Sequence, residues 1–201
     1  MKKELVIINL KKMNILAIWL FILPSIIALI FKFTLFKELS FGLGMWDYLI
    51  IVALYPLLMI FHEGLHALAF ITTGAPKGSV RFGAIPKKMM LYCTTNQPMK
   101  ASSYLFSLVL PLFVLGIVPL IVSTILLDWK YCILFATMIS GAGGDVMMSL
   151  ALIKKKGVKL VQDHPKAPAF YALYDENNLP DDFKEVTEED EIRLLNSINS
   201  K

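Results

Sequence analysis

Long apolar runs alternate with short polar stretches over the first 153 residues, and this pattern predicts membrane-spanning helices. A helix needs roughly 20 apolar residues to cross about 30 Å of hydrocarbon. Four runs reach this length, and we expect spans at about residues 14–31, 46–72, 103–127 and 131–153. Pro24, Pro111 and Pro119 fall inside these runs, where they bend a membrane helix without breaking it.

The polar stretch between the second and third runs has the character of β-strands. Residues 78–95 hold two short β-prone runs around a turn at Pro86, Lys87 and Lys88, which predicts a hairpin at the membrane interface. After residue 153 the chain becomes polar and then acidic. We therefore expect an all-α membrane protein with about four transmembrane helices, made of a membrane domain over 1–153, which includes the hairpin, and a short cytoplasmic extension over 154–201.

Composition and charge support a membrane protein. The chain is 56% hydrophobic with a mean hydropathy of +0.62, which exceeds the apolar share of ordinary soluble domains. Its basic residues flank the apolar runs, in the segments 2–12, 77–88 and 154–156. Because positive charge accumulates on the cytoplasmic side, both termini and the middle loop are expected there. A basic stripe with interleaved aromatic residues is missing from the sequence, so nucleic acid is not an expected partner. The two cysteines, Cys93 and Cys132, are expected to be free thiols.

The second apolar run contains the motif His62-Glu63-Gly64-Leu65-His66. Residues four apart lie on one face of a helix, so His62 and His66 can direct two imidazoles at one metal ion, with Glu63 beside them as a base. Three ionisable residues inside a span are costly, and a metal ion compensates that cost. Imidazole and carboxylate ligands favour Zn²⁺. The alternative is a histidine pair held by hydrogen bonds to neighbouring helices.

A catalytic zinc site usually has three protein ligands, so a third ligand is expected from another span. Asp145 is the acidic residue inside the fourth span, in a glycine-rich stretch that lets helices approach closely. Counted from the cytoplasmic ends of their helices, His62 and Asp145 lie at similar depths. The alternative for Asp145 is a role in a broken helix or a polar cavity. His164 lies beyond the spans, where a loop role is expected, and Asp47 is expected at the opposite interface.

These residues resemble known intramembrane metalloproteases. The HEGLH motif in one span, with an aspartate in a later glycine-rich span, resembles the site-two protease class. The layout is more similar to a bacterial family of integral-membrane proteins named putative zincin peptidases, through FHEGLHALAF, YCTTNQP, SGAGGD and VQDHP, which together extend from about Trp46 to Phe170. The resemblance implies zinc on His62, His66 and Asp145. Site-two proteases carry Asn-x-x-Pro before an Asp-Gly pair, whereas Asp145 follows Gly-Gly and precedes Val, so the resemblance is stronger for the histidine pair.

The sequence therefore predicts a zinc-dependent, membrane-embedded peptidase of the HExxH type in a bacterial cell membrane. Its expected partners are the lipid bilayer and a peptide or membrane-protein substrate. Two alternatives stay open. One is a non-catalytic zinc-binding membrane protein that acts as a regulator or adaptor, and the other is a membrane hydrolase for lipid-linked or soluble peptides.

Overall fold

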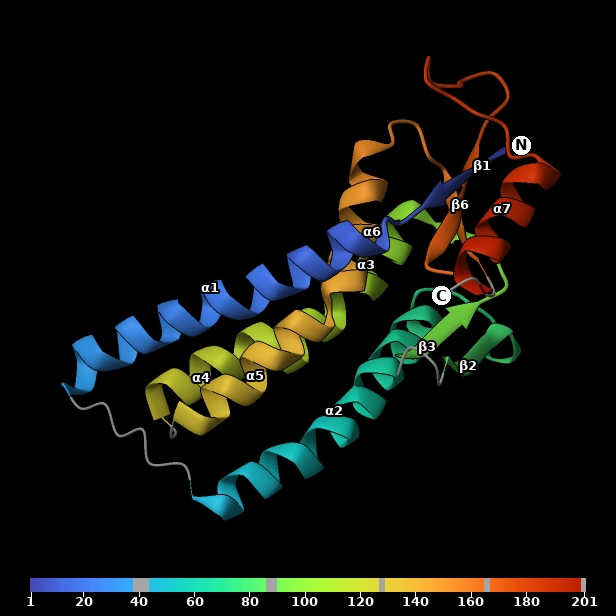
Figure 1. Cartoon of the computed structure of the whole chain (residues 1–201). Helices are drawn as coiled ribbons and strands as arrows, with labels where there is room; N and C mark the ends of the chain where they lie inside the picture. Colours follow the sequence, from blue (N-terminus) through green and yellow to red (C-terminus); the bar gives the residue numbers. More distant parts are fainter. Residues whose placement is uncertain (38–43, 86–89, 127–128, 165–166, 200–201) are drawn as a thin grey trace.

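The apolar runs form long helices in the computed structural model, which describes residues 1–37, 44–85, 90–126, 129–164 and 167–199 (Figure 1). The bounds are α1 Leu10–Phe36, α2 Met45–Thr72, α3 Ala101–Pro111, the π-helical turns η3 Leu112–Ile117, α4 Val118–Leu126, α5 Trp129–Gly141 and α6 Gly143–Lys154. Three helical stretches are long and apolar enough to cross a membrane: α1, α2 and the continuous α3–η3–α4. The pair α5–α6, bent by 44°, makes a fourth if it counts as one span. The predicted end of the third run at Leu127 lies outside the described residues.

The helices expose large apolar side chains, as a bilayer requires. Ile27 in α1 is 64% exposed and Val52 in α2 is 69% exposed. Apolar surface on this scale marks contact with another apolar phase, and lipid is the one that fits helices of this length. The length and exposed apolar surface of these helices are consistent with a membrane protein.

A four-stranded antiparallel sheet, which the sequence did not predict, lies at one end of the helices. Its strands are β1 Lys2–Ile7, β4 Met99–Lys100, β5 Leu160–Asp163 and β6 Ala169–Tyr174, in the order β1-β6-β5-β4. The first strand pairs with β6 from Lys2 opposite Tyr174 to Ile7 opposite Ala169. The expectation of an all-α fold is corrected here, because β1 and its partner are too distant in sequence for a local pattern to connect them.

The predicted hairpin is present as a separate two-stranded sheet. A 3₁₀ turn, η1 Lys77–Ser79, leads into β2 Val80–Ile85, which pairs antiparallel with β3 Met90–Thr95. The predicted turn at residues 86–88 lies outside the described residues. Because β3 packs against α2, it brings its backbone beside the histidine motif.

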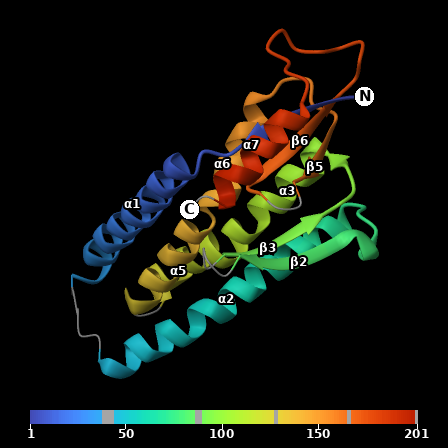
Figure 2. The same ribbon diagram turned by 45° about the vertical axis from the view of Figure 1, so that its right-hand side comes forward.

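The four-stranded sheet packs on the adjacent ends of α2, α3 and α6. The shared core contains Phe70, Tyr104, Leu152, Val161 and Phe170, all buried. Figure 2 shows this sheet and the hairpin together at one end of the helices. The sheet contains segments from before α1, from the middle loop and from after α6, so these three segments lie on the same side of the helices. A last helix, α7 Glu188–Asn199, follows the sheet.

Candidate metal centre

Two buried histidines lie one turn apart on α2. His62 is 3% exposed and His66 is 5% exposed, and their Nε2 atoms are 3.2 Å apart. The four-residue spacing directs both rings to the same face of the helix, which packs on α3. The motif therefore presents two imidazole nitrogens to one point.

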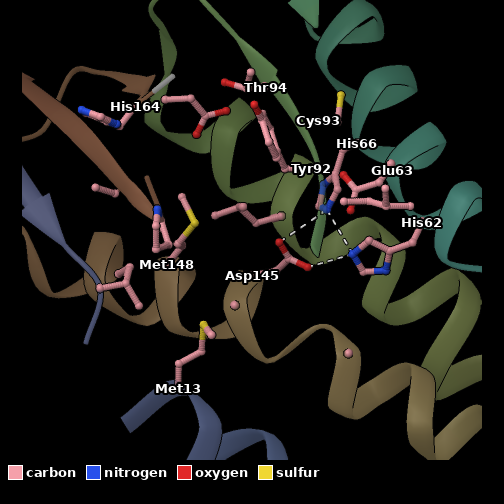
Figure 3. A pocket seen from close by; sticks show the side chains of 18 of the residues that line it. Met13, His62, Glu63, His66, Tyr92, Cys93, Thr94, Asp145, Met148 and His164 are labelled. Atoms are coloured by element: carbon pink, nitrogen blue, oxygen red, sulfur yellow. Dashed lines mark hydrogen bonds and ion pairs between the residues drawn. The ribbon is translucent and has the colours of Figure 1, made fainter. Parts of the chain in front are cut away.

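Asp145 reaches both histidines from α6. The helical path breaks between Gly141 and Gly143, which places Asp145 in the first turn of α6. Its Oδ2 lies 3.0 Å from Nε2 of His62, and its Oδ1 lies 3.4 Å from Nε2 of His66. The structure thus brings the three predicted ligands together, and the ligand atoms, one from each residue, all lie within 4.8 Å of one another (Figure 3).

The hydrogen bonds around His66 indicate what can bind at this point. Its Nδ1 lies 2.8 Å from the carbonyl oxygen of Ser107, so Nδ1–H donates there and the neutral ring keeps a lone pair on Nε2. That lone pair faces the carboxylate of Asp145 and Nε2 of His62. A cation between these acceptors satisfies all of them, and a partner on the far ring nitrogen is typical of metal-binding histidines.

The spacing of the three groups also suits zinc. Bonds of about 2.0–2.1 Å in a tetrahedron place neighbouring ligand atoms roughly 3.3 Å apart. The measured separations of 3.2, 3.0 and 3.4 Å lie close to that value. Two imidazoles and one carboxylate match the preferences of zinc and leave a fourth position for water or substrate. The residues present therefore fit a zinc ion.

Glu63 lies beside the three ligands and is not one of the group that could hold the metal. It is 8% exposed, and its carboxylate accepts a hydrogen bond from the backbone N–H of Cys93 in β3. Strand β3 therefore positions the acid that the motif predicts as the base.

The metal centre opens into a cavity of about 400 Å³. One face of α2 lines it from Tyr55 to Phe70, and β3 lines it from Leu91 to Thr94. These 15 steps along α2 correspond to a length of about 22 Å. The ligands and Glu63 thus lie in the wall of an elongated space with room for more than water.

Sequence reasoning missed a second polar group in this cavity. The hydroxyl of Tyr104 in α3 donates a hydrogen bond to Asp163 in β5. Burial raises the pKa of Asp163 to about 6, although donors from Tyr104, Thr94 and the Thr95 backbone oppose the shift. The one signal in the sequence was the stretch VQDHP, which includes Asp163.

The other predicted residues lie outside the metal-binding group. His164 lines the cavity beside Tyr171 but lies outside the metal-binding group. Asp47 forms an ion pair of 2.9 Å with Lys130 at the opposite end of the helices. Cys93 and Cys132 are both free, as predicted. Burial raises the pKa of the Cys93 thiol to about 12, so the thiol remains protonated near neutral pH.

Comparison with known proteins identifies the family. The family model described as "Putative zincin peptidase" matches residues 55–158, just over half of the chain, and the match covers His62, His66 and Asp145. None of the curated proteins and none of the solved structures matches the chain significantly. The name of the family implies zinc and peptide-bond hydrolysis, both of which fit the geometry of the site. The chain belongs to the putative zincin peptidase family.

Proposed function

We propose that this protein is a zinc-dependent intramembrane peptidase in which His62, His66 and Asp145 hold the metal and Glu63 is the base. The convergence of the three ligand groups carries the proposal. A histidine pair held only by hydrogen bonds to neighbouring helices does not require its Nε2 atoms to face each other beside a carboxylate, whereas a shared cation does.

A bound zinc ion supplies a Lewis acid that polarises the scissile carbonyl and lowers the pKa of water. Glu63 accepts the proton from the attacking water as its oxygen forms a bond to the carbonyl carbon. When the C–N bond breaks, Glu63 transfers that proton to the leaving amine. Cys93 holds the carboxylate of Glu63 in the cavity wall through its backbone N–H, which limits the motion of the base.

The position of the site supports a substrate that reaches it from the membrane. His62 lies about 15 Å along α2 from Thr72, the end of the helix nearest the sheet. The cavity continues past it to Tyr55, about 10 Å further into the span. A hydrolase for soluble peptides has no need of space at that depth. We place the sheet and both termini on the cytoplasmic side of a bacterial cell membrane, because the basic residues gather there.

The hairpin offers a way to hold the substrate in extended form. Asn96 N–H donates to Ser79 across the hairpin, so alternate residues of β3 direct their N–H groups toward β2. Leu91 directs its N–H to the other edge, where the N–H of Cys93 is already held by Glu63, and both residues line the cavity. An unwound substrate segment can add to this edge as a further strand.

The metal content of purified protein tests the proposed ligands. We expect about one zinc ion per chain in wild type and in Glu63→Gln, because glutamine keeps the shape of a residue outside the ligand set. We expect little zinc in His62→Ala and Asp145→Ala. Wild type that binds no zinc, under conditions that avoid stripping the metal, contradicts the proposal.

A comparison of membranes from cells that express wild type or Glu63→Gln tests catalysis. Mass spectrometry of newly formed peptide termini should reveal membrane proteins cleaved only by wild type. If zinc is bound and the two sets of termini are identical, the protein is instead a non-catalytic zinc-binding regulator or adaptor.

A further inference from the structure

The cavity has two ends of different chemistry on either side of the metal centre. One end, the membrane arm, is bounded by the four helices α1, α2, α5 and α6 through Met13, Tyr55, Met59, Gly141 and Gly144. The opposite end, the sheet arm, is bounded by Thr94, Tyr104, Asp163 and His164. In Figure 3, Met13 and Thr94 lie on opposite sides of Asp145.

Two glycines keep the membrane arm open. A Cβ atom on Gly141 would lie 3.6 Å from Sδ of Met59, and one on Gly144 would lie 3.7 Å from Sδ of Met13. Both distances are ordinary van der Waals contacts, so a methyl group fits and a longer side chain projects into the arm. Neither glycine has a positive φ, so the helices tolerate a side chain at both positions.

The membrane arm suits an apolar side chain of variable shape. Methionine is flexible and polarisable, and methionine-rich surfaces accommodate different apolar partners. The sheet arm adds hydroxyl, carboxylate and imidazole groups, from β3, the start of α3 and the end of β5, to an apolar lining that includes Phe70 and Ala169. An extended peptide rises about 3.3 Å per residue, so roughly seven residues would run the length of the α2 segment that lines the cavity.

We propose that the membrane arm is a subsite for a bulky apolar side chain next to the scissile bond, and that the sheet arm takes the polar residues beyond it. This inference rests on the proposed peptidase function. The substrate class is then a transmembrane protein cleaved where its apolar span meets a polar segment outside the membrane. A large apolar residue lies on the membrane side of the cleaved bond.

Two metal-binding probes test the subsite without a known substrate. Acetohydroxamate and isocaprohydroxamate share the same metal-binding group, and the second adds a branched aliphatic chain. Calorimetric titration of zinc-loaded protein in detergent micelles gives both affinities. We expect wild type to bind isocaprohydroxamate at least about tenfold more tightly than acetohydroxamate, because the aliphatic group of isocaprohydroxamate moves from water into the membrane arm.

Leucine at either glycine should remove this advantage. In Gly141→Leu and Gly144→Leu the two probes should bind with nearly equal affinity, while acetohydroxamate binding and zinc content stay at wild-type values. Gly64→Leu is the matched control, because a Cβ there meets nothing within 4 Å and Gly64 is not among the residues that line the cavity. It should keep the full advantage. If the leucine variants fail to fold, Gly141→Ala and Gly144→Ala can replace them, because their methyl groups fit. They should lose a smaller part of the difference in affinity between the two probes.

The outcomes separate the subsite from the proposed function. If isocaprohydroxamate binds more tightly than acetohydroxamate by the same factor in Gly141→Leu, Gly144→Leu and Gly64→Leu, the subsite is overturned while the zinc site stands. Wild type that binds neither zinc nor acetohydroxamate overturns the proposed function and the subsite with it.

Discussion

The carboxylate of Asp145 lies 3.0 Å from Nε2 of His62, although 83 residues separate them in the sequence. The contact joins α2 to α6 and completes a set of groups that neither helix carries alone. In the proposed metal centre, this negative charge would offset the charge of the cation, since an unpaired charge inside a membrane is costly.

Asp145→Asn should weaken zinc binding more than its small change in shape suggests. Asparagine keeps the size of the side chain but removes the charge and leaves a poorer ligand. We expect zinc affinity to fall by at least about 100-fold, as measured by competition with a chromophoric chelator. Asp47→Asn is the control, since it removes an acid from the far end of α2. Equal affinity in Asp145→Asn and wild type would show that the third ligand lies elsewhere.

Asp163 should make stability depend on pH in a direction unusual for an acid. Burial raises the pKa of Asp163 to about 6, above its ordinary value of 3.8, so the folded protein holds this proton more tightly than the unfolded chain. Its contribution to stability is full below pH 4 and is lost as pH rises to about 6, by on the order of 3 kcal/mol. Asp163→Asn should reduce the slope relative to wild type, which melting curves of both proteins without metal at pH 4 to 7 can measure.

Asp175 provides a control of opposite sign for that experiment. Its carboxylate lies 2.6 Å from Nζ of Lys159, which lowers the pKa of Asp175. Its contribution is therefore present above pH 4 and is lost as pH falls further. Asp175→Asn should leave the slope between pH 4 and 6 unchanged. A slope in Asp163→Asn equal to that of wild type would assign the effect to a different group.

Proline at matched positions of the hairpin should distinguish its two edges. Leu91 and Ala84 are opposite each other in the register, and neither directs its N–H at the partner strand. Leu91→Pro removes a donor from the edge that lines the cavity, whereas Ala84→Pro removes one from the outer edge. With a substrate found from the mapped termini, Leu91→Pro should lower kcat/KM about three- to tenfold with zinc retained, because one backbone hydrogen bond is lost. Ala84→Pro should not. Equal losses would argue against strand addition on β3.

The helices and the metal-binding residues could be predicted because each depends on residues that are close together in the sequence or stand out within one helix. Long apolar runs defined the helices, and ionisable residues are so rare within them that His62, Glu63, His66 and Asp145 stood out. The four-stranded sheet was missed because β1 reads KKELVI, in which the lysines look like the flank of a span. Its partner β6 lies more than 160 residues away, and pairing at that distance leaves no local pattern.

The bond between Tyr104 and Asp163 was missed for a similar reason. Tyr104 reads as an aromatic residue at the start of a span, and Asp163 as one acid in a polar extension. Only the packing of β5 against α3 brings them together and buries the carboxylate. The two arms of the cavity likewise combine residues from five helices and from the strands β3 and β5, so their difference in polarity could not be predicted without the fold.

Gly116 should be among the positions most sensitive to an added methyl group. A Cβ there would lie 2.7 Å from Cγ1 of Ile139, so α5 must shift or the side chain must leave its rotamer. Overpacking of this kind costs about 1–3 kcal/mol, and we expect Gly116→Ala to lower the melting temperature in micelles. Gly64→Ala is the control, because its methyl group meets nothing within 4 Å and alanine favours the helix by up to about 1 kcal/mol. Zinc content should stay at the wild-type value in both variants while they are folded, since neither residue touches a ligand group. If Gly116→Ala melts at or above the wild-type temperature, the close packing between η3 and α5 does not limit the stability of the fold.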